Sequence, residues 1–221
     1  MIKAVLFDMD GTIADTMRFF GNTFPDFVAS VGKDPGSLAL PENVYAMPLE
    51  ETAAYLRDQY QLEMTVEEVV ASLLASIDSV YTEKAPLKPG AADFLARLHE
   101  AGVKILLVTN NEQSLAEALL RRNGVHDYFD GFFCGANLGL GKEEPTLIRT
   151  ALDAHGIAPE EAWMFEDSLV PMQTAQSIGV HAAAMLDPFH APAETAAIKE
   201  TAEAVFADYT EALPWLESQL A

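Results

Sequence analysis

The stretch LFDMDGTIADT, residues 6–16, joins an apolar run to three closely spaced carboxylic acids. The run itself, IKAVLF at residues 2–7, contains β-branched side chains and is typical of a strand buried in a parallel sheet. Asp8 and Asp10 follow it directly, although like charges repel one another and buried carboxylates are costly. The stretch therefore predicts a first strand whose carboxyl end needs a compensating positive charge.

Apolar runs and helical patterns alternate in the second half of the chain. Further buried strands are predicted at residues 103–108, 130–135, 162–166, 180–186 and 203–208. Helices are predicted at residues 90–101, 112–122, 145–156 and 168–178. This alternation predicts an α/β fold, a doubly wound (Rossmann-like) parallel sheet with helices on both faces.

Between the first and second predicted strands the sequence changes character. Residues 16–87 show helical spacing and turns but no convincing strand. The segment KAPLKPG, residues 84–90, closes this region with two prolines and a glycine, which favours a hinge. We therefore expect one α/β core domain formed by residues 1–15 and 88–221, with an all-helical insertion at residues 16–87.

Local signals predict where helices begin inside the insertion. Pro25 interrupts an apolar stripe, so we expect a helix to kink or restart there, with Thr23 and Asp26 forming its cap. Thr65 and Glu68 have the spacing of a capping box. An apolar helical stripe follows that box at Val66, Val69, Val70, Leu73, Leu74, Ile77 and Val80.

Composition narrows the possible partners. The 221 residues include 34 acids and 13 bases, so the formal charge is −21 and we expect neither nucleic acid nor anionic membrane as a partner. An anionic substrate would need a bound cation or a few local bases to attract it. Cys134 is the single cysteine and reads as a small buried apolar group. Without a signal-peptide pattern or a membrane-length apolar run, the chain reads as a soluble cytoplasmic protein.

Four polar clusters lie at or just after predicted strand ends. They comprise Asp8 and Asp10; Thr109, Asn110 and Asn111; Lys142; and Glu166, Asp167 and Ser168. Ligands of open α/β sheets bind beyond the carboxyl ends of the strands, where the strand order reverses. We therefore expect the four clusters to share one crevice.

Carboxylates gathered in one crevice need a counter-charge, and oxygen ligands of this kind suit Mg²⁺. The five histidines lack zinc-ligand spacing. A calcium loop starting at Asp8 fails, because Gly11 is its fourth residue instead of its sixth and Phe19 stands where a glutamate belongs. The segment GANLGLGKE fails as a phosphate loop, because Ala136 replaces the first glycine and Glu143 follows the lysine.

A divalent cation beside paired carboxylates suits phosphoryl transfer. One carboxylate can attack phosphorus and form an aspartyl-phosphate. The second can protonate the leaving oxygen and later activate water. The hydroxyl of Thr109, loop N–H groups and the ammonium of Lys142 can hold the phosphoryl oxygens as charge shifts.

The order and spacing of these motifs resemble those of the haloacid dehalogenase superfamily over essentially the whole chain. The motifs are DMDGT (8–12), VTN (108–110), Lys142 directly after a glycine, and FEDS (165–168). Four further segments are similar to its phosphatase branch with a helical cap after the first strand. They are IADT (13–16), KPG (88–90), AGVKILLVTNN (101–111) and FADYTEAL (206–213).

The resemblance implies a catalytic role for two acids. Asp8 would be the nucleophile and a metal ligand. Asp10 would be the general acid and base, and its backbone carbonyl would bind Mg²⁺. An acid at that position resembles phosphatases and phosphomutases, because dehalogenases of the superfamily carry an aromatic residue there. Asp15 reads as a local turn or cap without a chemical role.

The resemblance also implies which residues bind the phosphoryl group and the metal. Thr109 and Asn110 would bind the phosphoryl group, and Lys142 would steady it together with the nucleophile. Asp167 would ligate Mg²⁺, with Glu166 beside it or reaching the metal through water. The family commonly has glycine where Pro171 stands, but a helix capped by Ser168 would place this proline in its first turn, where it costs little.

The resulting hypothesis is a Mg²⁺-dependent phosphatase of a small phosphomonoester, of the sugar phosphate, phosphoglycolate or nucleotide class. The alternative is a mutase like the β-phosphoglucomutases, which must hold a second phosphate. Residues 16–87 offer only four bases, the loop at 43–51 has none, and Phe20 stands where those mutases carry a histidine. A catalytically silent binding protein of this fold is the third hypothesis. The oligomeric state is left open.

Overall fold

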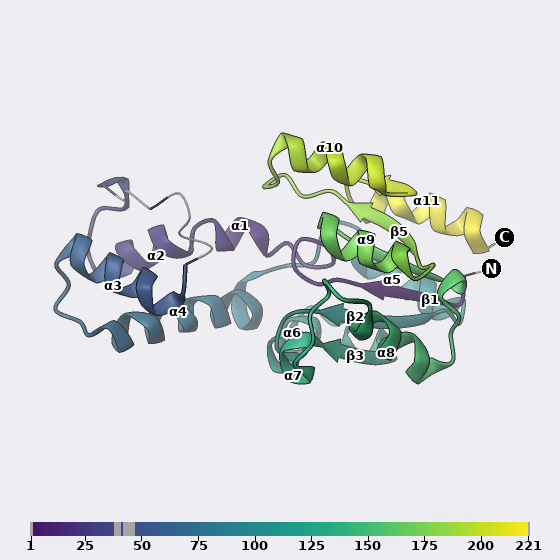
Figure 1. Cartoon of the computed structure of the whole chain (residues 1–221), viewed down its shortest axis with the longest axis horizontal. Coiled ribbons are helices and arrows are strands. Elements are labelled where there is room, and N and C mark those ends of the chain that lie inside the picture. The colour runs from purple at the N-terminus through teal and green to yellow at the C-terminus, as the bar shows by residue number, and fades with distance from the viewer. Residues whose placement is uncertain (1, 38–40, 42–46, 221) are drawn as a thin grey trace. The chain divides into compact units, whose positions relative to one another are not determined.

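Six parallel strands form a single sheet in the order β3-β2-β1-β4-β5-β6 (Figure 1). The computed structural model describes residues 2–37, 41 and 47–220. The strands are β1 (Ala4–Phe7), β2 (Lys104–Thr109), β3 (Gly131–Cys134), β4 (Ala162–Glu166), β5 (His181–Met185) and β6 (Ala204–Phe206). The predicted doubly wound sheet is therefore confirmed, and the strand order reverses next to β1.

One face of the sheet packs against α8 (Pro145–His155) and α9 (Leu169–Ser177). In register, Leu6 of β1 lies between Leu106 of β2 and Met164 of β4, and all three are buried. Ile148 of α8 and Ala175 of α9 belong to the same cluster. Burial of apolar area of this kind is the main favourable contribution to folding.

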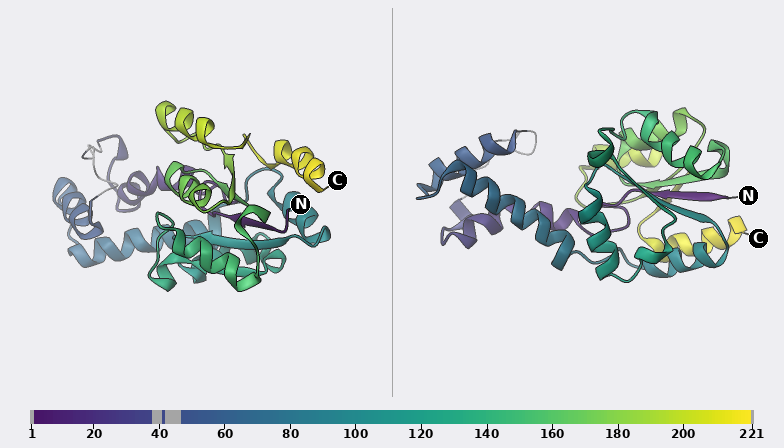
Figure 2. Two further views of the ribbon diagram at one scale, coloured as in Figure 1. Left: turned by 45° about the vertical axis from the view of Figure 1, so that its right-hand side comes forward. Right: turned by 90° about the horizontal axis from the view of Figure 1, so that it is seen from below.

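The opposite face packs against α5 (Ala91–Glu100) and α11 (Tyr209–Leu220), which lie side by side in Figure 2. Here Phe7 contacts Phe94 edge to face, with ring centroids 6.2 Å apart. Phe165 stacks on Tyr209 at 6.0 Å. Because both faces are covered, the four residues of β1 are all buried, which explains the continuous apolar run in the sequence.

The remaining helices of this part of the chain connect the strands. They are α6 (Gln113–Arg122), α7 (Gly135–Leu138) and α10 (Pro192–Thr201). The sequence patterns did not predict α7, α10 or α11. Helix α10 buries only Ile198, so it shows no apolar stripe, and α11 contains Pro214, which obscures its helical pattern.

The chain divides into two compact units, one of Met1–Met17 with Ala85–Ala221 and one of Arg18–Lys84. The longer helices of the second unit are α2 (Thr23–Ser30), α3 (Leu49–Tyr60) and α4 (Val66–Ser79), and a π-helical turn at Val80–Lys84 ends it. The short helix α1 (Met17–Phe20) begins at the boundary. The described residues of the second unit contain no strand. The core of this unit includes Phe24, Phe27, Leu56, Val69 and Leu73.

The capping box at the start of α4 is confirmed. The hydroxyl of Thr65 accepts the N–H of Glu68 at 3.2 Å, and the Glu68 carboxylate accepts the N–H of Thr65 at 2.8 Å. The prediction for Thr23 was wrong. Asn22 holds the N-cap position of α2 and Thr23 is the first helical residue, which places Pro25 third, where a missing N–H costs little.

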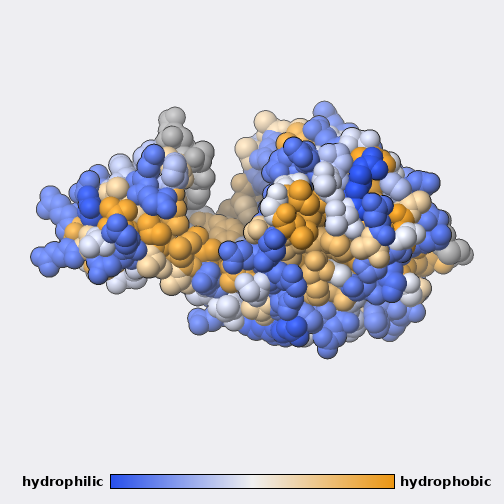
Figure 3. All heavy atoms as spheres, turned by 60° about the horizontal axis from the view of Figure 1, so that its bottom comes forward, coloured by the Kyte–Doolittle hydropathy of each residue, from blue (hydrophilic) through white to orange (hydrophobic). Residues whose placement is uncertain are grey.

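Part of the predicted apolar stripe of α4 faces solvent, because Leu74 is 46% exposed whereas Val69 and Leu73 are buried. Hydrophilic residues predominate on the face shown in Figure 3, with apolar groups between them. No helix in the described ranges combines the length and apolar character of a membrane span. Residues 43–46 of the predicted base-free loop lie outside the described residues.

Candidate active site

A tight loop after β1 presents the two acids of the first motif. The carbonyl of Met9 accepts the N–H groups of Thr12, Ile13 and Ala14 at 3.3, 3.1 and 2.9 Å. Gly11 adopts φ +78°, and a Cβ atom on it would lie 2.1 Å from Oδ2 of Asp167. The loop therefore approaches the end of β4 as closely as only glycine permits.

Three buried carboxylates meet at the ends of β1 and β4. One oxygen each of Asp8, Glu166 and Asp167 lies within 4.8 Å of the other two. Their residues are 4%, 0% and 3% exposed. Within residues 2–37, 41 and 47–220, no other group of three metal-ligating side chains is as close.

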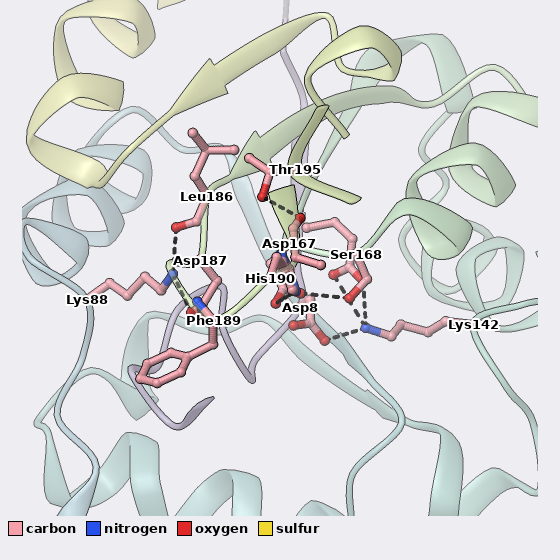
Figure 4. A network of polar contacts seen from close by, with 12 residues as sticks. Asp8, Lys88, Lys142, Asp167, Ser168, Leu186, Asp187, Phe189, His190 and Thr195 are labelled. Atoms are coloured by element: carbon pink, nitrogen blue, oxygen red, sulfur yellow. Dashed lines mark hydrogen bonds and ion pairs between the residues drawn. The ribbon is translucent and has the colours of Figure 1, made fainter. Parts of the chain in front are cut away.

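The ammonium of Lys142 supplies the positive charge of this cluster. It hydrogen-bonds Asp8 and lies 3.2 Å from Oε1 of Glu166 (Figure 4). Lys142 is itself only 5% exposed. Burial alone lowers the pKa of its ammonium, but the carboxylates of Asp8 and Glu166 outweigh burial and raise that pKa above its ordinary value. Lys142 therefore stays charged.

The two acids at the end of β4 are strongly perturbed. Burial, followed by the charge of Asp8, raises the pKa of the Asp167 carboxyl to about 8. The same two causes raise the pKa of the Glu166 carboxyl well above its ordinary value, although Lys142 opposes them. The cluster thus favours protonated acids unless additional positive charge is present.

The donor set fits Mg²⁺. Three carboxylates against one ammonium leave two negative charges, which one divalent cation would neutralise. All three donors are carboxylate oxygens. Oxygen ligands of this kind suit Mg²⁺, whereas zinc sites commonly use cysteine and histidine. Asp8, Glu166 and Asp167 are the residues that could hold the ion through their side chains.

The side chain of Asp10 lies outside the carboxylate cluster. It is partly exposed, and its Oδ2 accepts a hydrogen bond from the amide of Asn111 at 3.3 Å. Asp10 therefore does not belong to the group of side chains that could hold a metal ion together, and its role as general acid and base stays a prediction. Sequence reasoning gave no role to Asn111, although this residue lies in the polar cluster after β2.

Thr109 is the last residue of β2 and Asn110 follows it, at the same edge of the sheet. Thr109 is 2% exposed, and its hydroxyl accepts the N–H of Asn111 at 3.2 Å. The amide oxygen of Asn110 accepts the backbone N–H of Lys142 at 3.0 Å. The Asn110 side chain therefore holds the loop that carries Lys142, and its contact with a phosphoryl group stays a prediction.

Ser168 occupies the predicted N-cap position of α9, with Pro171 in the first turn as expected. Its hydroxyl makes no cap hydrogen bond, however, and instead lies 3.1 Å from Oδ1 of Asp167. Asp15 was predicted to make a local turn or cap, but its N–H donates to the carbonyl of Pro86, a residue distant in sequence, at 3.0 Å. Cys134 is 1% exposed, and burial raises the pKa of its thiol to about 11.

Three residues beside the acids were missed by sequence reasoning. Nε2 of His190 lies 3.4 Å from Oδ2 of Asp167, and Lys88 pairs with Asp187 (Figure 4). Asp187 follows β5, so the rule that ligands bind beyond the carboxyl ends of strands could have indicated it. Lys88 is the first residue of the KPG segment, which the sequence analysis singled out without giving the lysine a role, and the loop of His190 carries no comparable signal.

A family model described as haloacid dehalogenase-like hydrolase matches residues 2–179. The phosphorylated carbohydrates phosphatase of Thermotoga maritima is 27% identical over 179 residues, which cover 81% of this chain and 82% of the relative. A phosphoglycolate phosphatase of Thiobacillus denitrificans is 27% identical over 185 residues, with 80% of each chain covered. The chain is also similar to the crystal structure of a HAD family hydrolase from Deinococcus radiodurans R1 with bound phosphate and sodium. The two sequences are 25% identical and the TM-score is 0.76. The match covers 99% of this chain and 97% of that chain.

Proposed function

Because the chain belongs to the haloacid dehalogenase-like hydrolase family, we propose that it is a Mg²⁺-dependent phosphatase that hydrolyses a small phosphomonoester. The observation that carries this proposal is the convergence of Asp8, Glu166 and Asp167 around one point, with Lys142 against Asp8. The similarity to two phosphatases and to a hydrolase with bound phosphate supports it.

In the first step, a carboxylate oxygen of Asp8 attacks phosphorus and the bond from phosphorus to the ester oxygen breaks. Asp10 gives its proton to that oxygen, so an alcohol leaves and an aspartyl-phosphate remains. Lys142 holds Asp8 and faces the transferring group, and Thr109 lies at the neighbouring strand end. When bound, Mg²⁺ would offset the charge of the phosphoryl oxygens.

In the second step, the carboxylate of Asp10 takes a proton from water, and the hydroxide attacks phosphorus. The bond between phosphorus and the Asp8 oxygen breaks, which releases phosphate and restores both acids. General acid–base assistance of this kind contributes about 10²–10⁴ in rate. The hydrogen bond from Asn111 to Asp10 orients the carboxylate between the two steps.

We assign residues 1–15 and 88–221 as the catalytic core and residues 16–87 as the cap. The similarity to a phosphorylated carbohydrates phosphatase and to a phosphoglycolate phosphatase favours these two kinds of substrate among the substrate classes. Hydrolysis is favoured over a mutase reaction because bases are few in the cap, and Arg57 is paired with its neighbour Asp58 at 2.7 Å. The single buried Cys134 suits a reducing compartment, and we place the protein in the cytoplasm.

The test is phosphate release from 4-nitrophenyl phosphate by the purified chain with Mg²⁺, with and without a chelator. We expect turnover that the chelator abolishes and that Asp8→Asn reduces to background. Asp130→Asn is the matched control, because Asp130 pairs with Lys104 elsewhere in the protein. Turnover that survives Asp8→Asn would contradict the proposal. Conversion of a sugar 1-phosphate to its 6-phosphate faster than phosphate release would identify a mutase instead.

A further inference from the structure

The loop after β5 is fastened to the segment that follows the cap. The ammonium of Lys88 donates to Oδ2 of Asp187 at 3.1 Å and to the carbonyl of Leu186 at 3.0 Å. The two side chains of the ion pair are 6% and 1% exposed. The backbone N–H of Lys88 in turn donates to the carbonyl of Ile13, in the loop after β1, at 2.8 Å. Both ends of Lys88 are therefore fixed.

Asp187 also shapes the turn that leads to His190. Its Oδ1 accepts the N–H of Phe189 at 2.9 Å, and its carbonyl accepts the N–H of His190 at 3.3 Å. A carboxylate that bonds the backbone two residues on is a standard way to close such a turn. The conformation of residues 187–190 thus depends on the same carboxylate that Lys88 holds.

This turn places His190 against one of the acids of the site. Nε2 of His190 lies 3.4 Å from Oδ2 of Asp167, and the imidazole is only 11% exposed. The hydroxyl of Ser168 lies 3.1 Å from the other oxygen, Oδ1. Figure 4 shows His190 and Ser168 close to Asp167. Each oxygen of this acid therefore has its own polar neighbour.

We propose that His190 is a positioning residue for Asp167, and that the Lys88–Asp187 pair holds His190 in place for this task. The inference rests on the proposed function, in which Asp167 ligates Mg²⁺. Carboxylates that bind metals are commonly oriented by outer hydrogen-bond partners, whose loss costs about 10–100-fold in metal affinity or activity. His190 touches neither the transferring group nor Asp8 in this account, and acts only through Asp167.

The experiment compares His190→Phe, which keeps a flat ring but loses both ring nitrogens, with His190→Gln, which keeps a polar side chain that can donate an N–H. His181→Phe is the control, because His181 also pairs with a carboxylate, Glu203 at 2.7 Å, but lies at the opposite end of β5. Mg²⁺ affinity of the full chain is measured by calorimetry and by the rise in melting temperature with Mg²⁺. Neither readout depends on turnover.

We expect His190→Phe to weaken Mg²⁺ binding by about 10–100-fold, His190→Gln to restore most of it, and His181→Phe to leave it unchanged. Unchanged affinity in His190→Phe would overturn the positioning role and leave the proposed phosphatase intact. A wild-type protein that does not bind Mg²⁺ would overturn both. The melting temperature without Mg²⁺ separates loss of folding from loss of the ligand's orientation.

A second comparison tests the supporting pair. Asp187→Asn keeps an oxygen for the N–H of Phe189 but removes the charge that Lys88 holds. If this pair acts through His190, the variant weakens Mg²⁺ binding several-fold. Combining it with His190→Phe then adds no further loss. Fully additive losses would contradict the link between the pair and His190.

Discussion

A Cβ atom on Gly11 would lie 2.1 Å from Oδ2 of Asp167, so the loop after β1 and the acid after β4 are in contact across the switch point of the sheet. Glycine at this position has φ +78°, in the left-handed region that other residues rarely adopt. The approach of the two loops and the backbone conformation both require the absence of a side chain. A side chain at residue 11 would therefore collide with the Asp167 carboxylate.

Gly11→Ala is expected to displace Asp167 and to lower turnover and Mg²⁺ affinity by at least about tenfold, as disturbed ligand positioning does. Gly102→Ala is the matched control, because Gly102 has φ +72° but no atom within 4 Å of the added Cβ. The control should lose about 1–2 kcal/mol of unfolding free energy through backbone strain and keep full turnover. Equal activity of the two variants would show that the site does not need the close approach of Gly11 to Asp167.

Lys142→Met is expected to lower kcat by about 10²–10³, the usual effect of removing a preorganised donor from the charge that develops in the transition state. The variant also leaves Asp8 and Glu166 without their ammonium partner. Lys104→Met serves as the control, because Lys104 pairs with Asp130 and its side chain is 48% exposed. Steady-state kinetics of phosphate release measure kcat for both variants. A kcat of Lys142→Met within twofold of wild type would refute the proposed role of Lys142 in stabilising the transition state.

Cys134 should resist thiol reagents in the folded protein. Burial raises its thiol pKa to about 11, so below that pH the group is mainly the neutral thiol, and the reactive thiolate appears only as pH rises. At pH 8 about one molecule in a thousand carries the thiolate. Reaction with a chromogenic disulfide should be slow at pH 8 and fast once denaturant exposes the residue, whose thiol then regains an ordinary pKa. Rapid reaction of the native protein would show that the thiol is accessible.

The capping box should matter for stability but not for chemistry. Thr65→Ala removes the acceptor for the Glu68 N–H and should cost about 1 kcal/mol of unfolding free energy. Thr65→Ser keeps a hydroxyl and should be close to wild type. Denaturant titration measures both variants. A stability of Thr65→Ala equal to that of Thr65→Ser would mean that the box contributes nothing.

Much of the core could be predicted because its physical causes are local. Phe7 and its neighbours in β1 form a continuous apolar run, since helices cover both faces of the sheet. Helix α10 was not predicted, because Ile198 is its single buried residue and one buried residue leaves no periodic apolar stripe in the sequence. Thr23 was misassigned because the pattern alone does not say whether a polar residue precedes the first turn or starts it.

In the candidate site, the residues at the ends of β1, β2 and β4 could be predicted from strand ends and motif spacing. His190 could not, because it reaches Asp167 through a turn that depends on Lys88, a residue distant in sequence. The contact of the Asn110 side chain could not be predicted either, since its amide oxygen accepts the Lys142 N–H only in the folded chain. Contacts of this kind follow from tertiary structure and leave no local pattern.

The central claim, that Asp8 takes the phosphoryl group, is tested most directly by trapping the intermediate. The protein is mixed with 4-nitrophenyl phosphate and Mg²⁺, quenched, and reduced with borohydride, which converts an acyl phosphate of aspartate to homoserine. Asp10→Asn should increase the trapped fraction, because the nitrophenolate leaves without a proton whereas water needs a base to attack. Peptide mass spectrometry should find the modification at Asp8 alone and only with substrate. Sustained turnover with no modification at Asp8, or with the phosphoryl group on another residue, would contradict the account.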